Sequence, residues 1–457
     1  MTLDRRNFLS VSAFAPAFVP MGGTSTASAR PAAPAPTALG IEAVHFGVRP
    51  NSADDQTRAL QYAIDQAAGV RVPLVLRPGS YRAGGLILRP GSQIVGIRGA
   101  SRLILNREAP LIQSQEADHI GLSGLVLEGP GQRAESRGLV HLVGGRAVRL
   151  VDCEIAGAAG HGLVLERIEG EVRGNTISQC GDAGLFSLDA CGLLIADNTV
   201  RLCGNNGILV WRSEEGDDGT RVIGNRVEEI AAVGGGSGQN GNAINVFRAA
   251  NVTVADNRIR KVAFSAVRGN AASNLQVIGN NCLACGEVAL YAEFGFEGAV
   301  IAHNVVDGAA IGVAVTNFNR GGRLAVVQGN VIRRLLAQRP AGTDPEDSAG
   351  IGIGVEADTA VIGNIIEGAP TAGIALGWGH YLRDVTVSGN IVRSAGVGIA
   401  VSVSRGAGAA VIADNLIADA RRGAIVGMEL KQPVTGDLAK EDAGRFAQLA
   451  ISGNRVR

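Results

Sequence analysis

An asparagine that recurs between short runs of alternating apolar residues constrains this fold more than any other feature of the sequence. A typical context is Val-Arg-Gly-Asn-Thr-Ile, which ends at Ile177. Successive markers lie 23, 27, 32, 23, 24, 26, 34, 26, 25 and 39 residues apart. Self-similarity at such a period indicates a solenoid with one structural unit per repeat. The marker residues are Asn175, Asn198, Asn225, Asn257, Asn280, Asn304, Asn330, Asn364, Asn390, Asn415 and Asn454.

Each repeat also carries a second element of the form Gly-Ile-x-Val, such as residues 207–210 and 398–401. A unit with two or three short extended runs and no helical pattern is one coil of a parallel β-helix, whose coils stack ~4.8 Å apart. Aromatic residues make up only 4% of the chain, which suits an interior of small aliphatic side chains. Asparagine tolerates the left-handed conformation of a tight corner, and stacked asparagine side chains can form a ladder along the axis. The sequence therefore predicts an all-β solenoid.

Helical spacing before the repeats predicts a capping helix over residues 52–68. Leu60, Ala63, Ile64 and Ala67 would lie on one face of that helix. We therefore expect a single parallel β-helix domain rather than several globular domains. Its predicted parts are residues 44–457 for the whole domain, 44–100 for the N-terminal cap, about 100–430 for the coils and 431–457 for the C-terminal cap.

The N-terminus has the pattern of an export signal. Arg5 and Arg6 precede Phe8-Leu9 and a mildly apolar stretch, and Ala-Ser-Ala at residues 27–29 fits a cleavage site. The sequence predicts a twin-arginine signal peptide over residues 1–29 and a linker over 30–43. The expected partner during export is the twin-arginine (Tat) translocase, and the expected location is periplasmic or secreted.

The segments at 46–51 and 76–81, the helix between them and the repeats resemble the pectin-lyase-like right-handed parallel β-helix superfamily. This resemblance covers about residues 44–457 and implies a right-handed solenoid with an N-terminal capping helix. Together with the twin-arginine motif, the pattern is similar to the TAT-translocated repetitive proteins, an uncharacterised bacterial family. That family carries no assigned reaction, so the resemblance implies no catalytic residues.

Charge and hydropathy narrow the classes of partner. Lys+Arg and Asp+Glu are both 42, so the net charge is zero and nucleic-acid binding is not expected. No segment after the signal holds about 20 uninterrupted apolar residues, so we expect no membrane anchor in the mature protein. No residue constellation predicts a cofactor or a metal. The acidic loop with Glu214, Asp217 and Asp218 could bind Ca²⁺, and the alternative is a solvated acidic loop.

Two long insertions, at residues 234–242 and 337–350, follow the asparagine corner and precede the Gly-Ile-x-Val strand. They should emerge along one edge of the solenoid, and insertions grouped on one face often mark the binding face of a repeat protein. Aromatic rings beside polar groups suit sugar rings, so we expect a polysaccharide to bind there. The alternative is an ordinary solvent-exposed face. The predicted binding residues are Trp211, Arg212, Asn245, Phe247, Arg248, Glu356 and Trp378.

Tyr291 and Glu293 form the predicted acid–base pair, with Arg268 one coil earlier and His380 as a further candidate. A lyase or epimerase acting on a polyuronate or envelope glycan needs a group that neutralises the carboxylate, a base and an acid. That reaction is slightly preferred to hydrolysis, which would need two carboxylates. The alternative function is a non-catalytic polysaccharide-binding or structural β-helix protein.

Overall fold

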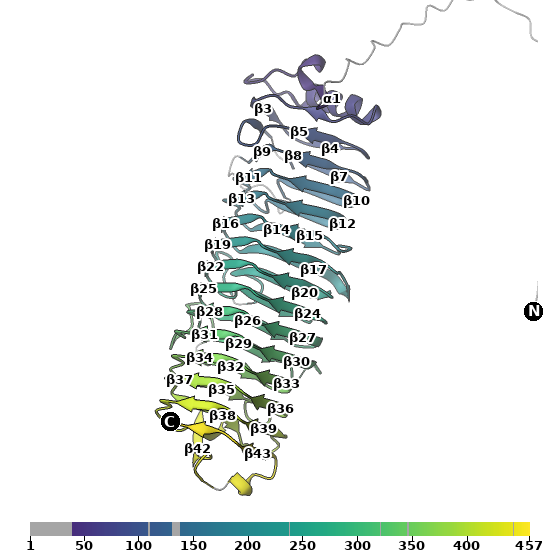
Figure 1. The fold of residues 1–457 in the computed structure, drawn as a ribbon. Coiled ribbons are helices and arrows are strands. Elements are labelled where there is room, and N and C mark those ends of the chain that lie inside the picture. Colours follow the sequence, from purple (N-terminus) through teal and green to yellow (C-terminus); the bar gives the residue numbers. More distant parts are fainter. Residues whose placement is uncertain are drawn as a thin grey trace, which may run out of the picture. The chain divides into compact units, whose positions relative to one another are not determined.

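The computed structural model describes residues 39–107, 110–129, 138–236, 238–319, 321–344, 347–441 and 443–457. Over these residues the chain winds into stacked coils of parallel strands (Figure 1). Helix there is confined to α1 (Thr57–Gly69) and two short 3-10 turns, η1 (Ala43–Phe46) and η2 (Ala443–Arg445). The predicted all-β solenoid with a capping helix is confirmed. The predicted signal peptide, residues 1–29, and residues 30–38 of the predicted linker lie outside the described residues.

Each full coil contributes strands to three parallel faces, which we call the first, second and third sheets in the order in which the chain visits them, although long strands join the first two into one hydrogen-bonded sheet of 29 strands over the described residues. The first sheet contains the Gly-Ile-x-Val strands. Its strands β10 and β12 are long enough to continue into the second sheet. The first sheet comprises β4 (Leu86–Leu88), β7 (Ile112–Gln115), β10 (Val140–Val151), β12 (Leu163–Arg173), β14 (Ala183–Leu188), β17 (Asn206–Asp217), β20 (Asn242–Ala250), β23 (Val267–Asn270), β26 (Val288–Glu293), β29 (Ile311–Thr316), β32 (Ile351–Val355), β35 (Ala372–Leu376), β38 (Val397–Ser402) and β41 (Ile425–Glu429).

The other two sheets complete the coil, and the asparagine marker lies at the corner between them. The second sheet comprises β1 (Ile41–Glu42), β2 (Leu74–Val75), β5 (Gln93–Val95), β8 (Gly121–Ser123), β15 (Leu194–Ala196), β18 (Arg221–Ile223), β21 (Thr253–Ala255), β24 (Leu275–Ile278), β27 (Glu297–Ala302), β30 (Arg323–Gln328), β33 (Ala357–Ile362), β36 (Arg383–Ser388), β39 (Ala410–Ala413) and β43 (Leu449–Ser452). The third comprises β3 (Gly79–Ala83), β6 (Ser101–Leu105), β9 (Leu125–Glu128), β11 (Glu154–Ala156), β13 (Thr176–Ser178), β16 (Thr199–Cys203), β19 (Arg226–Ile230), β22 (Arg258–Val262), β25 (Asn281–Cys285), β28 (Val305–Asp307), β31 (Val331–Arg333), β34 (Ile365–Glu367), β37 (Ile391–Arg393), β40 (Leu416–Ala418) and β44 (Arg455–Val456).

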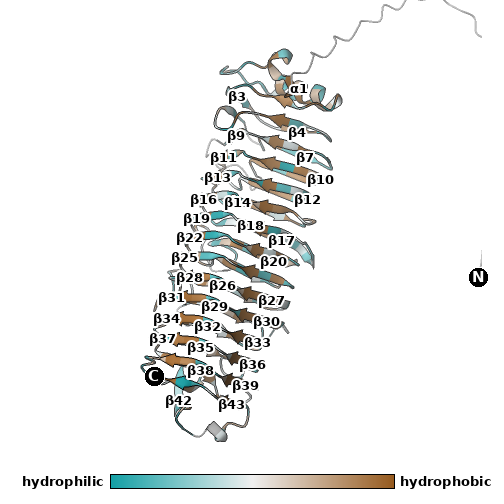
Figure 2. Ribbon diagram, in the orientation of Figure 1, coloured by the Kyte–Doolittle hydropathy of each residue, from teal (hydrophilic) through white to brown (hydrophobic). Residues whose placement is uncertain are grey.

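The interior is a stack of aliphatic side chains at equivalent positions of successive coils. Ile208, Ile244, Val267, Leu290 and Val313 are in register and fully buried. Because every coil repeats this pattern, the core is continuous along the axis and needs few large rings. The outward positions vary more: Figure 2 shows hydrophilic strands such as β19 and β22 and hydrophobic ones such as β31 and β34 within the same third sheet.

The predicted asparagine ladder is confirmed. Asn280 Nδ2 donates to Asn304 Oδ1 at 3.0 Å and to the carbonyl of Val254 at 2.9 Å. Asn304 repeats the first contact with Asn330 at 3.0 Å. The same asparagine-to-asparagine bond links each marker from Asn175 to Asn454 to the next. Buried amides are thus satisfied along the whole corner.

The conformational reason that we gave for the asparagine is wrong. The residue in the left-handed region is the one before the marker, for example Gly279 with φ 70° and Asp256 with φ 56°. The turn therefore bends at that residue, which is often glycine because glycine has no Cβ to clash. The asparagine is needed for its side chain, which satisfies backbone groups of neighbouring coils.

The glycine that opens the Gly-Ile-x-Val strand lies at a second tight corner. A Cβ on Gly207 would lie 2.4 Å from the carbonyl oxygen of Ala243 and 2.6 Å from Cγ1 of Val227. Gly207 has no room for a Cβ, and the equivalent positions of the neighbouring coils also hold small residues, Gly184 and Ala243. The long insertions enter at this corner, because 231–241 connects β19 to β20 and 334–350 connects β31 to β32. They therefore share one edge of the first sheet.

The caps differ from prediction in detail. Helix α1 begins at Thr57 rather than at residue 52, although Leu60, Ala63, Ile64 and Ala67 are buried as predicted. Strand β1 lies inside the predicted linker and pairs with β2. At the C-terminal end, β42 (Gln432–Asp437) folds back antiparallel on β41. Within the described part of the chain, we find no helix with the length and hydropathy required to cross a bilayer.

Candidate functional site

The outward face of the first sheet carries two neighbouring columns of side chains. Register pairs Leu209, Asn245, Arg268, Tyr291 and Ala314 in one column. The next column contains Trp211, Phe247, Asn270, Glu293 and Thr316. Since strands of the same sheet stack ~4.8 Å apart, consecutive members of a column are direct neighbours.

A row of rings runs along this face, and we call His161, Phe186, Trp211 and Phe247 the aromatic row. Consecutive ring centroids are 5.4, 5.3 and 5.6 Å apart, with tilted or edge-to-face geometry. The indole Nε1 of Trp211 donates to Asn245 Oδ1 at 3.2 Å. The structure thus brings together three of the predicted binding residues, and it adds Phe186 and His161 to them.

The two predicted arginines directly follow Trp211 and Phe247 in β17 and β20. The Arg248 guanidinium stacks on the Phe247 ring at 4.8 Å and donates to the carbonyl of Ser213 at 3.1 Å. Arg212 reaches the carbonyl of Ala190 at 3.5 Å. Both arginines therefore border the aromatic row at its edge with the second sheet.

A compact charged group follows the aromatic row, and we call Arg268, Glu287, Tyr291, Glu293 and Arg339 the buried cluster. Arg268 Nε and Nη2 donate to Glu293 Oε1 and Oε2 at 2.7 and 2.9 Å, a bidentate pair. The guanidinium carbon lies 4.9 Å from the centroid of the Tyr291 ring. The predicted catalytic residues Arg268, Tyr291 and Glu293 are therefore in contact.

Both carboxylate oxygens of Glu293 accept hydrogen bonds from neighbouring side chains. Only 1% of its side chain is exposed, and Oε1 accepts a second hydrogen bond, from Asn270 Nδ2 at 2.8 Å. Three of the ~4 lone-pair positions of this carboxylate are therefore occupied. The predicted base lies next to its predicted partners and is almost closed to solvent.

The sequence analysis missed Glu287 and Arg339. Arg339 comes from the 334–350 insertion, and its Nη1 lies 2.8 Å from Glu287 Oε1 and 3.1 Å from Asp347 Oδ2. Its Nε donates to the carbonyl of Ser348. Both residues lie at corners, where coil lengths vary and a repeat register gives no alignment. The one available signal was a glutamate directly before the strand that carries Tyr291.

Burial changes the proton affinities in the buried cluster. It raises the pKa of Glu287, an effect that the guanidinium groups of Arg268 and Arg339 oppose. It also raises the pKa of Tyr291 to about 12, and the nearby carboxylate of Glu293 acts in the same direction. Burial acts to lower the pKa of Arg268, but its hydrogen bonds to Glu293 together with the charges of Glu293, Tyr291 and Glu287 outweigh burial and raise it. Arg268 Nη1 and Glu287 Oε2 lie 3.8 Å apart, and neither has a hydrogen-bond partner among the described residues.

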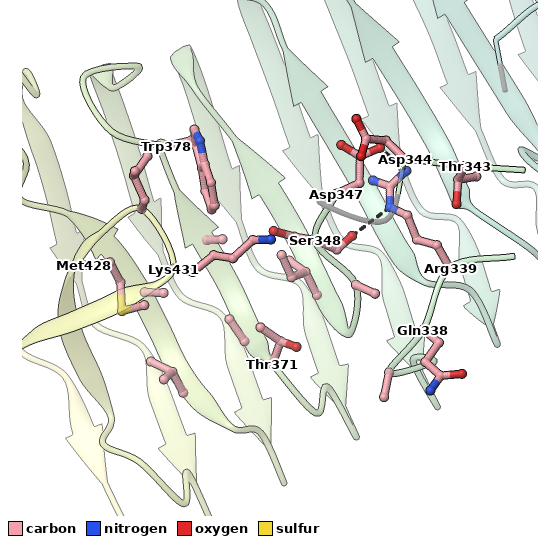
Figure 3. Close-up of a pocket in the computed structure, with 18 of the residues that line it drawn as sticks. Gln338, Arg339, Thr343, Asp344, Asp347, Ser348, Thr371, Trp378, Met428 and Lys431 are labelled. Carbon is pink, nitrogen blue, oxygen red and sulfur yellow. Dashed lines mark hydrogen bonds and ion pairs between the residues drawn. The ribbon is translucent and has the colours of Figure 1, made fainter. Parts of the chain in front are cut away.

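Beyond the buried cluster, the same face has an open cavity of about 640 Å³, which we call the groove. Its floor consists of outward residues of β32, β35, β38 and β41, and the 334–350 insertion forms one wall. Figure 3 shows Trp378 and Met428 on the opposite side from Arg339 and Asp347. Trp378 is thus the one predicted binding residue that lines it.

His380 and Glu356 lie away from the buried cluster. His380 follows β35, which is three coils beyond Tyr291, or ~14 Å along the axis at the usual strand spacing. Its ring packs against Tyr381 at 4.0 Å and Phe318 at 6.0 Å. Glu356 Oε2 accepts the backbone N–H groups of Asn317 at 2.8 Å and Phe318 at 2.9 Å, so it holds a loop.

The acidic loop does not gather its carboxylates. Asp217 accepts a hydrogen bond from Asn251 at 2.7 Å, Asp218 accepts one from the backbone of Thr220, and Glu214 is exposed. In the described ranges, no group of three or more His, Cys, Asp or Glu side chains is arranged to hold a metal ion.

Residues 112–227 match the family model described as a right-handed β-helix region. Among solved structures, the N-terminal fragment of gene product 12 of bacteriophage phi29 is 14% identical, with a TM-score of 0.53 over 85% of this chain and 69% of that chain. The pre-mature form of that product is 11% identical, with a TM-score of 0.52 over the same shares. At these identities the likeness concerns the fold alone, and the right-handed parallel β-helix is confirmed.

The A-module of mannuronan C-5 epimerase AlgE6 from Azotobacter vinelandii is 19% identical, with a TM-score of 0.47 over 70% of this chain and 99% of that module. Among curated proteins, no sequence matches this chain.

Proposed function

We propose that this protein binds a neutral, hydroxyl-rich polysaccharide along the outward face of the first sheet. The observation that carries the proposal is the aromatic row, in which rings follow one another at 5.3 to 5.6 Å across consecutive coils. Rings cover the C–H faces of sugars, and neighbouring amides such as Asn245 bind hydroxyl groups. A row of this kind suits an extended chain better than a single small molecule.

The charges of the buried cluster favour a neutral glycan over a polyuronate. Two guanidinium groups, of Arg268 and Arg339, lie among three carboxylates, of Glu287, Glu293 and Asp347. A uronate carboxylate would meet no excess positive charge there. Its desolvation would also cost free energy that the paired arginines could not return.

Catalysis is the second candidate, and one observation favours it. Glu287 is the carboxylate of the buried cluster with an oxygen that has no hydrogen-bond partner among the described residues. Burial raises its pKa, which brings a carboxylate closer to the proton affinity of a general base. Tyr291 is protonated at neutral pH, as any tyrosine with a pKa of 10.0 or above is, and could donate a proton to a leaving oxygen. A lyase or epimerase would then use Glu287 in place of Glu293.

Binding is tested by calorimetric titration of the exported protein with neutral and acidic glycans, for example a β-glucan, dextran, alginate and polygalacturonate. We expect a neutral glycan to bind, and Trp211→Ala to weaken it about tenfold, or about 1.4 kcal/mol. The matched control is Tyr62→Ala, which removes a half-exposed ring from α1 at the N-terminal end of the solenoid, several coils before the aromatic row. Equal affinity in the wild type and Trp211→Ala would refute the proposal.

Product analysis separates the two candidates. New unsaturated ends or altered uronate stereochemistry, lost in Glu287→Gln, would establish catalysis. Unchanged glycans that nonetheless bind would leave a binding protein.

Export through the twin-arginine pathway is part of the same proposal, supported by Arg5-Arg6 and the apolar stretch after them. Replacement of both arginines by lysine should leave the protein in the cytoplasmic fraction. Periplasmic recovery of that variant would exclude the pathway.

A further inference from the structure

The groove lies on a part of the first sheet where outward side chains are small. In the column that continues from Tyr291, register places Ala314, Gly354, Ala375 and Ala400 one after another. A Cβ on Gly354 would meet no heavy atom within 4 Å, so the space above it is open. The sheet backbone is the same as in the buried cluster, and the missing side-chain volume leaves a trough along the axis.

The floor of this trough is apolar. Ile351, Ala372 and Val397 form the neighbouring column towards the insertion, and each is at most 8% exposed. Ala372, Val397, Ala400 and Val426 form a hydrophobic cluster of their own, outside the solenoid core, with Met428 packed against it. The floor therefore continues over several coils without a charged side chain among its described residues.

Hydrogen-bonding groups on the floor are already used. The hydroxyl of Ser402 donates to the carbonyl of Gly379 at 2.5 Å. The backbone groups of β32, β35 and β38 pair with each other in the parallel ladder. A sugar ring on this floor would lose the water bound to its hydroxyl groups and find no partners, which is unfavourable.

The rim is polar and carries both signs of charge. Arg339 and Asp347 line the wall formed by the insertion, and Trp378 and Lys431 line the opposite side (Figure 3). The groove thus has an apolar bottom and a polar mouth. This arrangement fits a ligand with the same division, namely an apolar chain and a hydroxylated or charged head.

We infer that the groove binds a single extended aliphatic chain whose polar head lies at the mouth beside Trp378. Its floor extends over β32, β35, β38 and β41, or ~14 Å at the usual strand spacing, and it is apolar over that length, which suits an alkyl chain better than a hydroxylated ring. The chain gains hydrophobic contact with alanine, valine and methionine side chains, and it needs no hydrogen-bond partner. An acylated glycan and a free lipid share this chemistry.

This inference goes beyond the proposed glycan binding and does not require it. The aromatic row and the groove are separate parts of one face, so Trp211→Ala should weaken the glycan without changing binding of the chain. A protein that binds alkyl chains but no glycan would refute only the proposed function.

Titration with dodecyl maltoside below its micelle concentration tests the inference, with maltose and dodecanoate as the other probes. We expect dodecyl maltoside to bind and maltose not to bind. Binding of dodecyl maltoside alone indicates a sugar-linked chain as the source, and equal binding of dodecanoate indicates a free fatty chain. Either result supports the groove as an alkyl site, and failure of both alkyl probes to bind overturns it.

Two variants locate the site. Ala400→Phe fills the floor and should lower alkyl affinity at least tenfold, whereas Ala360→Phe, on the outward side of β33 in the second sheet, should not change it. In a Trp211→Phe background Trp378 is the remaining tryptophan, so its fluorescence should change when the chain binds. That signal reports on the groove even if Ala400→Phe folds poorly. Alkyl binding that leaves Trp378 fluorescence unchanged and is unaffected by Ala400→Phe would place the chain elsewhere and refute the inference.

Discussion

The buried cluster and the groove are built on the same sheet, in the same columns, with opposite contents. In one column, Arg268 and Tyr291 are followed by Ala314, Gly354 and Ala375. The inward partners of these residues are aliphatic in both regions. This difference shows that the aliphatic core determines the backbone of the coils but not their outward side chains. An outward position can therefore hold a paired charge in one coil and a glycine or alanine in another.

The two regions also differ in what they cost the folded protein in free energy. The buried cluster places ionised groups where burial is costly, and it depends on every partner being present. The groove exposes apolar surface, which costs less in the free protein and is recovered when a ligand covers it. We therefore expect substitutions in the first region to affect folding and substitutions in the second to affect binding.

The largest effect should follow from breaking the ion pair of the buried cluster. Arg268→Met leaves the carboxylate of Glu293 buried without its cation, which typically lowers the free energy of unfolding by about 3–5 kcal/mol. Urea denaturation measures it. The matched control is Arg323→Met, because Arg323 pairs with the exposed Glu297 and its loss should cost less than about 1 kcal/mol. Equal effects of the two variants would show that burial does not distinguish them.

The next prediction concerns the asparagine ladder, which runs through the coils of both regions. Asn280→Ala removes the side chain that bonds Asn304 and the carbonyl of Val254 and that accepts from Asn257, so we expect a loss of about 3 kcal/mol. Asn281→Ala changes the next residue, which is exposed on β25, and should alter stability by at most about 0.5 kcal/mol. If both variants melt alike, the ladder contributes little to stability.

A smaller effect separates inward from outward positions within one strand, β32. A Cβ on Gly352 would lie 2.4 Å from the carbonyl oxygen of Gly373, so Gly352→Ala should destabilise the protein by about 1–3 kcal/mol. Gly354→Ala adds a methyl group in open space and should stabilise by about 0.5 kcal/mol. Thermal unfolding of the pair measures both signs. A destabilising Gly354→Ala would mean that the floor of the groove is more crowded than the comparison requires.

The smallest effect is spectroscopic and concerns the closure of the buried cluster. Tyr291 has its pKa raised to about 12 by burial, so the folded state keeps its phenol protonated where an unfolded chain would begin to ionise near 10.0. The contribution that protonated Tyr291 makes to the free energy of unfolding is fully present below pH 10, and it is lost as the pH rises to about 12. The ultraviolet difference between wild type and Tyr291→Phe should show tyrosinate only above about pH 11. Ionisation of Tyr291 near pH 10 would show an open, hydrated cluster.

The sequence was sufficient to predict the coils, the ladder and the shared edge of the insertions, because each depends on a period. Contact among Arg268, Tyr291 and Glu293 also followed from register. The conformation at the corner did not follow: Gly279 and Asp256 adopt positive φ, while the asparagines next to them serve through their side chains. A preference of a residue type alone could not distinguish those two roles.

The residues of the candidate site that lie outside the strands could not be predicted in this way. Glu287 and Arg339 meet across 52 residues, and one of them lies in an insertion with no equivalent in other coils. The groove was missed for another reason: small residues form no motif, and the runs with Gly354, Ala375 and Ala400 predicted a strand rather than a site. Four consecutive coils with alanine or glycine at one outward position were the available signal.

The asparagine ladder has a consequence for how the sequence of such a protein can evolve. Asn304 bonds Asn330 across 26 residues at 3.0 Å, and Asn330 bonds Asn364 across 34 residues at 2.9 Å. Coil length and coil register are therefore independent, because the extra residues form a loop at one edge of the coil and the asparagine hydrogen bond to the next coil is unchanged. A gene of this kind can acquire or lose whole loops there by insertion and deletion, and each event alters the edge of the first sheet while the scaffold folds as before.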